Sequence, residues 1–369
     1  MTLTFFIIIL GFLTVIQAMI PHMLRQTLIF GVTVPESFTR TKEILTYKRL
    51  YTFITFFVGF VFLALFTIWA ILNSPSDETI VLVGTVLEFA LIALSLGMYF
   101  TLHAKMLKLK SESNWEEGLK KVRVADVTFH KQVELVPRSA YIILLIVTAG
   151  LVGYTFTQYG NLPDVIPIHW GPNGQPDGFT NKSPFSVIGL LIILLIMQGM
   201  MLAINEMMRR SGVQLSANRR KVSRTQQLAH RKYSSLYLYL ITFLMTALFG
   251  FLQLGTIHEN IASQVLLISV PLIFLFLVLI GTAVYAFKVG QSGSRIRVEE
   301  EDEQADTATT DADDDRYWKG GIFYINKQDP SILVEKRFGI GWTLNFGHPL
   351  SAFLFIIPIV LILVVSFLI

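Results

Sequence analysis

The sequence predicts an all-α polytopic membrane protein with eight transmembrane helices, both termini outside the cell, and a small β-containing cytoplasmic module. Of its 369 residues, 53% are hydrophobic and only 15% are charged, whereas a soluble domain carries roughly 25% charged residues. Long stretches contain no charge, and the Lys and Arg residues concentrate in alternate loops between the apolar segments. Together these observations indicate a chain that crosses a bilayer several times.

Eight segments are apolar over the ~20 residues that a helix needs to cross the hydrocarbon core of a bilayer. The first has no Lys or Arg before it, so it lacks the positive start of a secretory signal and is expected to remain as a helix. In chain order the segments are Leu3–Ile20, Thr52–Leu72, Thr79–Leu102, Ala140–Thr157, Ser186–Asn205, Leu236–Gln253, Gln264–Phe287 and Leu350–Ile369.

The distribution of cations between the loops predicts the orientation. Of the 30 Lys and Arg residues, 29 lie in four alternate loops, and the opposite loops contain only Lys182. Cytoplasmic loops carry an excess of Lys and Arg, so the four basic loops are expected to face the cytoplasm. The same bias accounts for the net charge of +4, and we expect no binding of nucleic acid.

The chain divides into four parts. Residues 1–287 are expected to form a seven-helix membrane domain with an outer loop at 158–185, and residues 350–369 form the eighth helix. Segment 288–315 is acidic and free of aromatic residues, which predicts a disordered linker. Segment 316–349 is rich in aromatic residues, and we expect a small β-type module there, with an extended connector on the bilayer as the alternative.

Turn signals divide the predicted module into short β-prone stretches. Gly320-Gly321 precedes the β-prone Ile322–Ile325, and Gln328-Asp329-Pro330 is a turn signal. The predicted strands are Ile322–Ile325, Ile332–Val334 and Trp342–Phe346.

The outer loop holds the first candidate binding residues. Leu162–Phe179 reads LPDVIPIHWGPNGQPDGF, a polar and turn-rich stretch between two long apolar segments. We expect Val165–Trp170 to be extended, residues 171–174 to form a tight turn with Gly174 at positive φ, and residues 176–178 to form a second turn.

Asp164, His169 and Asp177 are the residues of this loop that could titrate or bind a metal. One His and two Asp are suitable ligands, but their spacing matches no known metal-binding pattern. We therefore predict no metal and no cofactor. Together with Trp170, expected at the membrane interface, these residues are interpreted as a binding surface or as a compact lid.

The same loop resembles the hallmark of a bacterial membrane-protein family that includes the SdpI-type bacteriocin immunity proteins. The family pattern is Leu-Pro-Asp, Ile-Pro-Ile-His and a Gly-x-Pro-Asp turn, and here it falls between Leu162 and Asp177. Phe30–Glu36, reading FGVTVPE, and the Trp318–Phe346 module are similar to segments of longer, mostly uncharacterised Gram-positive relatives. The immunity proteins themselves are shorter and lack this module. The resemblance implies a multi-pass protein of the bacterial plasma membrane with a role in immunity or signalling.

Glu88 is the second candidate site. It lies near the middle of the third apolar segment, and no Lys or Arg lies within any predicted span. An ionised, unpaired carboxylate is costly at this depth, so Glu88 is expected to face the interior of the helix bundle. Two interpretations stay open: an ion, proton or ligand site, or a neutral Glu hydrogen-bonded to a neighbouring helix.

The third candidate is the basic loop 209–232, which holds eight cations and no acid. It is interpreted as an ordinary cytoplasmic loop, with contact to anionic lipid headgroups or to the acidic linker as alternatives.

No P-loop, HExxH, GxSxG or kinase signature is present, so no catalytic residue is predicted. We expect a protein that senses or binds an envelope-active molecule, such as an antimicrobial peptide. Its expected partners are the lipid bilayer, an extracellular peptide and a cytoplasmic regulator. The alternatives are an ion- or proton-coupled transporter or intramembrane enzyme centred on Glu88, with His169 or His258-Glu259 at the outer mouth, and a structural partner in a larger membrane complex.

Overall fold

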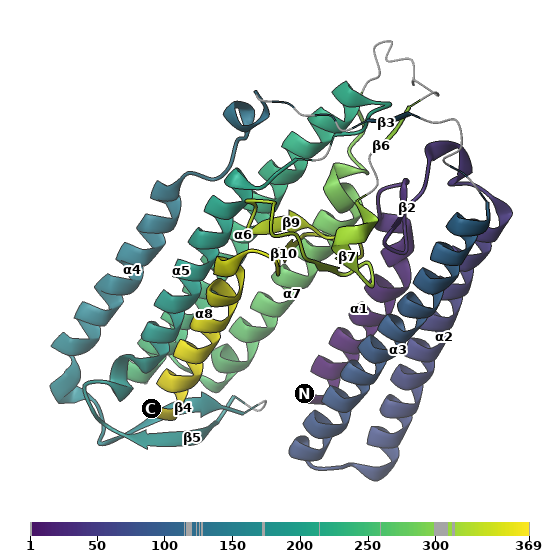
Figure 1. Cartoon of the computed structure of the whole chain (residues 1–369). Coiled ribbons are helices and arrows are strands. Elements are labelled where there is room, and N and C mark those ends of the chain that lie inside the picture. Colours follow the sequence, from purple (N-terminus) through teal and green to yellow (C-terminus); the bar gives the residue numbers. More distant parts are fainter. Residues whose placement is uncertain are drawn as a thin grey trace.

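The chain is mostly helical in the computed structural model (Figure 1). The structure describes residues 2–113, 115, 120–122, 124, 126, 128–171, 174–213, 215–258, 260–298, 309–311 and 314–368. Eight helices among these residues are long and apolar enough to cross a bilayer, which confirms the predicted multi-pass membrane protein. They are α1 (Thr2–Met23), α2 (Lys42–Asn73), α3 (Asp77–Glu112), α4 (Arg138–Thr157), α5 (Gly189–Arg210), α6 (Arg220–Ile257), α7 (Gln264–Lys288) and α8 (Pro349–Leu368).

Three helices extend well beyond the predicted spans. Helix α6 begins at Arg220 instead of Leu236, α2 begins at Lys42, and α3 continues to Glu112. The predicted helix bounds follow the length of each apolar run, which corresponds to the thickness of the hydrocarbon core. A helix continues past that boundary where polar residues cover its exposed face and no Gly or Pro interrupts it, as in 220–235.

The helices form two groups that lie side by side (Figure 1). Helices α1, α2 and α3 pack against one another, and α4 to α8 form the second group around α5 and α6. Helix α7 contacts both α6 and α1, so it brings the two groups together. Figure 1 shows both termini at the same end of the helices, as an even number of crossings requires.

Polar side chains join the helices inside the second group. The Gln198 amide of α5 donates to Thr148 of α4 at 2.9 Å and to Thr246 of α6 at 2.8 Å. Seven residues after Thr246 on α6 and seven after Thr148 on α4, Gln253 donates to Thr155 at 3.2 Å. Hydrogen bonds of this kind hold helices together in lipid, where apolar contact alone gives little preference between protein and acyl chains.

Ten short strands occur among the described residues. They are β1 (Leu28–Ile29), β2 (Val32–Thr33), β3 (Lys120–Val122), β4 (Val165–Trp170), β5 (Pro176–Asn181), β6 (Thr309–Asp311), β7 (Trp318–Lys319), β8 (Phe323–Tyr324), β9 (Leu333–Glu335) and β10 (Trp342–Leu344). All five pairs are antiparallel except β3–β6. The β4–β5 hairpin lies at the end of the helices that carries the termini (hereafter the hairpin side), and the other strands lie toward the opposite, module side (Figure 1).

The module contains two hairpins, β7–β8 and β9–β10, instead of one meander of three strands. Tyr324 pairs with Asn345 in an isolated bridge that joins them. Gly320 and Gly321, both at positive φ, occupy the turn between β7 and β8. Strands β8 and β10 are shorter than predicted and β9 is shifted by one residue, and the carbonyls of Asn326, Asp329 and Ser331 accept hydrogen bonds from the Asn345 side chain.

The FGVTVPE segment packs directly against this module. Gly31 lies in the β1–β2 turn at φ +77°, and a Cβ there would lie only 2.9 Å from the Gly321 Cα. The Tyr99 hydroxyl of α3 donates to the Gly320 carbonyl at 3.0 Å, and Arg337 donates to the Gly31 carbonyl at 3.1 Å. Two segments that are far apart in the sequence therefore form one contact surface.

Asp315 holds this surface to the first helix group. Its carboxylate lies 2.9 Å from Lys110 of α3, accepts a hydrogen bond from the Thr33 hydroxyl at 2.9 Å, and also binds Arg337. Burial alone raises the pKa of Asp315, but Arg337 and Lys110 hold it below its ordinary value.

Most of the predicted acidic linker, namely 299–308 and 312–313, lies outside the described residues. On its N-terminal side, Gln291–Gly293 is a buried 3-10 turn. On its C-terminal side, β6 pairs with β3, and Asp311 lies 3.2 Å from Arg25.

Replacing Asn345 with Ala should destabilise the module. Its buried amide donates to the carbonyls of Asn326, Asp329 and Ser331 and accepts from the backbone N–H groups of Asn326 and Gly347. Each buried backbone group left without a partner costs about 1–3 kcal/mol. We expect the Tm of the purified protein to fall by roughly 5 °C or more. Asn73→Ala, which removes one exposed hydrogen bond at the end of α2, should leave Tm unchanged; equal shifts would contradict this role.

Candidate functional site

The outer loop folds into a two-stranded hairpin. Strand β4 covers the predicted extended segment, and Gly174 has φ +73°, as predicted for the tight turn. A Cβ on Gly174 would lie 2.7 Å from the Ile268 side chain, so the turn fits closely against α7. The second predicted turn, 176–178, is wrong: these residues begin β5, because cross-strand pairing with β4 outweighs the local turn preference of Pro-Asp-Gly.

The hairpin brings His169 and Asp177 together. His169 lies opposite Gly178 on the neighbouring strand, and its Nδ1 contacts the Asp177 carboxylate. A Cβ on Gly178 would lie 2.9 Å from the His169 Cβ, so this glycine leaves room for the ring. Both side chains remain exposed, at 71% and 52%. No cluster of three metal-ligating side chains occurs among the described residues.

Asp164 does not join this pair. Its side chain is fully exposed at the start of the hairpin, 3.6 Å from the Lys182 ammonium. Lys182 itself donates to the Leu162 carbonyl at 2.7 Å and lies over the Tyr159 ring. An exposed ion pair of this kind contributes little stability.

Trp170 lines a cavity of about 140 Å³ beneath the hairpin. The roof is formed by residues of β4, and the floor is mostly apolar, with polar groups from three other elements. Ser186 comes from the segment before α5, Gln253 and Thr256 come from α6, and Ser366 comes from α8. An apolar cavity with a few convergent polar groups is typical of a small-molecule or side-chain binding site.

Glu88 belongs to a different part of the molecule. It lies on α3, within the first helix group, and is partly buried. Its Oε1 atom is buried without a hydrogen-bond partner among the described residues. The structure therefore separates Glu88 from the hairpin residues, and the sequence-based candidates form two sites instead of one.

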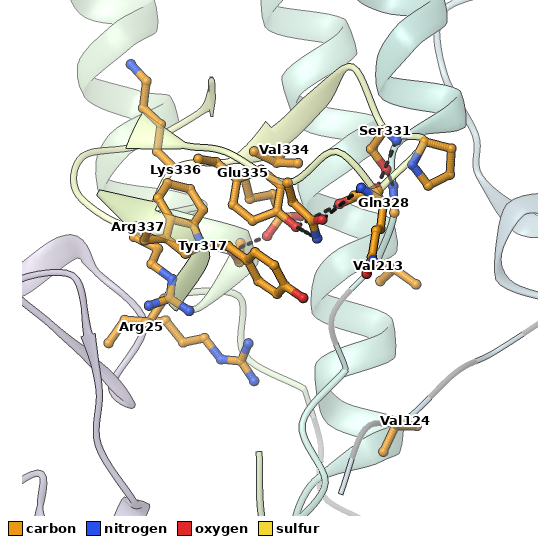
Figure 2. A pocket seen from close by; sticks show the side chains of 18 of the residues that line it. Arg25, Val124, Val213, Tyr317, Gln328, Ser331, Val334, Glu335, Lys336 and Arg337 are labelled. Atoms are coloured by element: carbon orange, nitrogen blue, oxygen red, sulfur yellow. Dashed lines mark hydrogen bonds between the residues drawn. The ribbon is translucent and has the colours of Figure 1, made fainter. Parts of the chain in front are cut away.

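A larger cavity, of about 520 Å³, lies on the module side. In Figure 2, Tyr317 points into it between Arg25 and Val213, and residues Val334, Glu335 and Lys336 lie along the module. Residues of β9, the turn at 326–331, the end of α5 and the start of the chain after α1 form its walls. None of these residues was predicted as a site.

Glu335 is the central polar residue of this region. It accepts a hydrogen bond from Gln227 of α6 at 2.9 Å and another from Ser292, and it lies 3.6 Å from the ring of His230. Burial alone raises the pKa of Glu335, but contacts with His230, Arg231 and Ser292 outweigh burial and lower it to about 2. The carboxylate is therefore ionised at neutral pH and ties β9 to α6 and to the end of α7.

His230 and Arg231 are fully buried although they lie in the basic segment 209–232, which the sequence suggested is an ordinary cytoplasmic loop. Arg231 donates to the carbonyls of Met208 and Gly212, and its guanidinium lies between the rings of Phe129 and Trp342. The only sequence signal for this burial is the amphipathic pattern of 220–235, which continues the apolar face of α6.

Several polar atoms in this cluster have no hydrogen-bond partner among the described residues. They are Gln227 Oε1, both ring nitrogens of His230, Arg231 Nε, Glu335 Oε1 and Trp342 Nε1. Buried polar atoms are normally paired, so the contact between the module and α6 retains capacity for further hydrogen bonds.

Replacing Glu335 with Gln should change the pH dependence of stability. Because the folded-state pKa lies below the ordinary value of 4.5 at about 2, the carboxylate stabilises the fold above about pH 4.5, and this stabilisation is lost as the pH falls toward 2. We expect Glu335→Gln to lower Tm at pH 7 and to flatten the fall in Tm between pH 5 and 3. Glu134→Gln, at an exposed ion pair with Lys232, should retain the wild-type profile; a wild-type profile in Glu335→Gln would contradict the assignment.

Comparison with known proteins finds two family models of unknown function. A domain of unknown function, DUF1648, matches residues 144–195, which span most of α4, the hairpin and the start of α5. A family of unknown function, DUF5808, matches residues 327–351, which include β9, β10 and the start of α8. No curated protein and no solved structure matches the chain. The matches indicate an uncharacterised membrane-type family, and they coincide with the elements that form the two cavities.

Proposed function

We propose that this protein is a plasma-membrane receptor that binds an envelope-active molecule, such as an antimicrobial peptide, at the β4–β5 hairpin. Binding changes the contact between the module and α6, and the module passes this change to a cytoplasmic regulator. The module side faces the cytoplasm and the hairpin side faces outward, because 29 of the 30 Lys and Arg residues fall in the loops of the module side.

One observation carries this proposal: two helices each run from the cavity beneath the hairpin to the module. Helix α6 contributes Gln253 and Thr256 to the cavity beneath the hairpin, and at its other end it binds Glu335 of the module through Gln227. Helix α8 contributes Ser366 to the first cavity and begins directly after the module. Helices that join two sites in this way provide a physical path for coupling between them.

The surface of the hairpin suits an amphipathic ligand. Val165, Ile168 and Phe179 are 51%, 39% and 57% exposed, beside the polar pair of His169 and Asp177. Apolar and charged groups therefore lie together on one small structure at the membrane surface. The resemblance of this loop to SdpI-type immunity proteins supports a ligand of the same class, a peptide that attacks the cell envelope.

Removing the His169 ring of the polar pair together with the cavity-lining Trp170 ring should abolish ligand recognition. Cells that carry His169→Ala with Trp170→Ala should become sensitive to at least one member of a panel of envelope-active peptides, with at least a tenfold fall in the inhibitory concentration. Asp164→Asn, which changes only an exposed ion pair, is the matched control and should protect like the wild type. Unchanged sensitivity to the whole panel in the first variant would refute recognition by the hairpin.

The same variants test transmission to the module. The chain contains no cysteine, so Lys327→Cys in the exposed turn of the module provides a single labelling site. The protecting peptide should change its rate of maleimide labelling in the wild-type background and in Asp164→Asn, but not in His169→Ala with Trp170→Ala. Peptide binding without any change in labelling would retain the receptor and exclude this route of signalling.

A second function, an ion- or proton-coupled transporter or intramembrane enzyme, is favoured by one observation, the buried and unpartnered Oε1 of Glu88. The His258 that the sequence suggested for the outer mouth lies in the second helix group instead, with its Nε2 2.7 Å from the Tyr154 hydroxyl of α4, and Glu259 lies outside the described residues. Unpartnered carboxylates within membrane spans commonly mark ion or proton pathways.

Glu88→Gln distinguishes the two functions. If Glu88 carries protons, pH-driven flux in proteoliposomes should fall at least tenfold in Glu88→Gln and stay unchanged in Glu78→Gln, an exposed residue in the first turn of the same helix. Full flux in Glu88→Gln, or no flux in the wild type, would exclude the transporter and leave the receptor.

A further inference from the structure

The junction between the two helix groups carries an unusual set of cations. Helix α7 contacts α1 there. The buried Gln291, just after α7, accepts a hydrogen bond from the Arg25 backbone at 2.8 Å and donates to the Lys336 carbonyl. The ends of α1 and α7 and the module therefore meet around one side chain.

Three basic residues gather beside this point. His22, at the end of α1, forms a hydrogen bond with Thr52 of α2 at 3.0 Å. Lys48 lies one turn before Thr52 on α2, and Arg295 follows the end of α7. His22 is linked to α2 through Thr52, and α7, which Arg295 follows, contacts α1, so the three side chains lie on the three segments that meet at this junction.

These cations have no acidic partner among the residues that the structure describes. Lys48 is partly buried, and neither Lys48 nor Arg295 forms an ion pair with a described carboxylate. Acids on adjoining segments are engaged elsewhere: Asp311 with Arg25, and Asp315 with Lys110 and Arg337.

The basic loop 209–232 behaves differently. Arg219, Arg224 and Lys232 pair with Glu36, Asp126 and Glu134, and Arg231 is buried among backbone carbonyls. Acids from other loops therefore neutralise much of the segment that the sequence suggested for lipid headgroups. At the α1–α2–α7 junction, by contrast, no ion pair with a described carboxylate neutralises Lys48 or Arg295.

An exposed apolar stripe leads along α7 to these cations. Ile273, Phe276, Ile280, Val284 and Phe287 recur at intervals of three or four residues, which places them on one face of the helix, and each is at least 39% exposed. The Arg295 guanidinium lies 6.0 Å from the ring of Phe287, the last residue of the stripe. His22 and Lys48 flank the predicted hydrocarbon spans, which end at Ile20 and begin at Thr52, so the cations lie at the depth of lipid headgroups.

We propose that this junction binds one anionic phospholipid. The headgroup phosphate lies among His22, Lys48 and Arg295, and the acyl chains lie along the stripe on α7. Charge complementarity selects the headgroup, since each cation near an anionic lipid surface contributes roughly fivefold in affinity. This site is separate from the hairpin and does not depend on the proposed receptor function.

The test is lipid retention by the purified full-length chain, measured by native mass spectrometry during titration with phosphatidylglycerol or phosphatidylcholine. Lys48→Gln with Arg295→Gln should weaken phosphatidylglycerol binding by about 30-fold, at about fivefold for each cation. Lys319→Gln with Lys327→Gln removes the same charge from exposed module residues and should change binding less than twofold. Phosphatidylcholine should bind weakly to all three proteins.

Two results would overturn the proposal. Equal loss in both double variants would show general attraction to the basic face, and displacement of the lipid by millimolar inorganic phosphate would show a site for free anions. If the Lys48→Gln double variant has a reduced Tm, Arg295→Gln alone, at an exposed side chain, provides the test with an expected loss of about fivefold.

Discussion

The position of the module depends on the ionised carboxylate of Glu335. This side chain binds Gln227 of α6 and Ser292 after α7, and it lies beside His230. A buried charge is tolerated only where hydrogen bonds and opposite charge replace the water that it has lost. The module can therefore dock in one arrangement relative to α6 and α7, and the start of α8 and the α1–α7 junction are placed by that arrangement.

The same contact is well suited to change. Gln227, His230, Arg231 and Trp342 each retain a polar atom without a partner in the described structure. A buried network that is only partly hydrogen-bonded is less favourable than a fully paired one. The free-energy difference between the docked module and other arrangements is therefore smaller than the corresponding difference for the helix bundle. This contact is less fully hydrogen-bonded than the Gln198 and Gln253 layers, whose amide groups are bonded to neighbouring helices.

Hydropathy and turn chemistry predicted much of the fold. The eight spans follow from apolar length, and the Gly174 turn from the conformational freedom of glycine. The β5 strand and the long α6 were missed, because pairing with β4 and packing of an amphipathic face are tertiary effects that local propensity does not contain.

The candidate sites were less predictable than the fold. His169 and Asp177 were recognised by residue type, but their pairing depends on the register of β4 against β5. Glu335 and His230 are 105 residues apart in the sequence, and no local pattern marks Glu335 as buried or indicates that the two side chains meet. Such a cluster becomes visible only once the module is placed against α6.

Helix α8 shows how a change beneath the hairpin can reach the module. Among its described side chains, Ser351 and Val365 are buried, one near each end, whereas most of the others are exposed. The helix is thus held tightly at two points, one beside the module and one beside the cavity that Ser366 lines. Under the proposed function, a ligand that displaces the cavity end of α8 acts on a helix whose other buried end, at Ser351, lies six residues from Asn345, where a single side chain holds the backbone of the module.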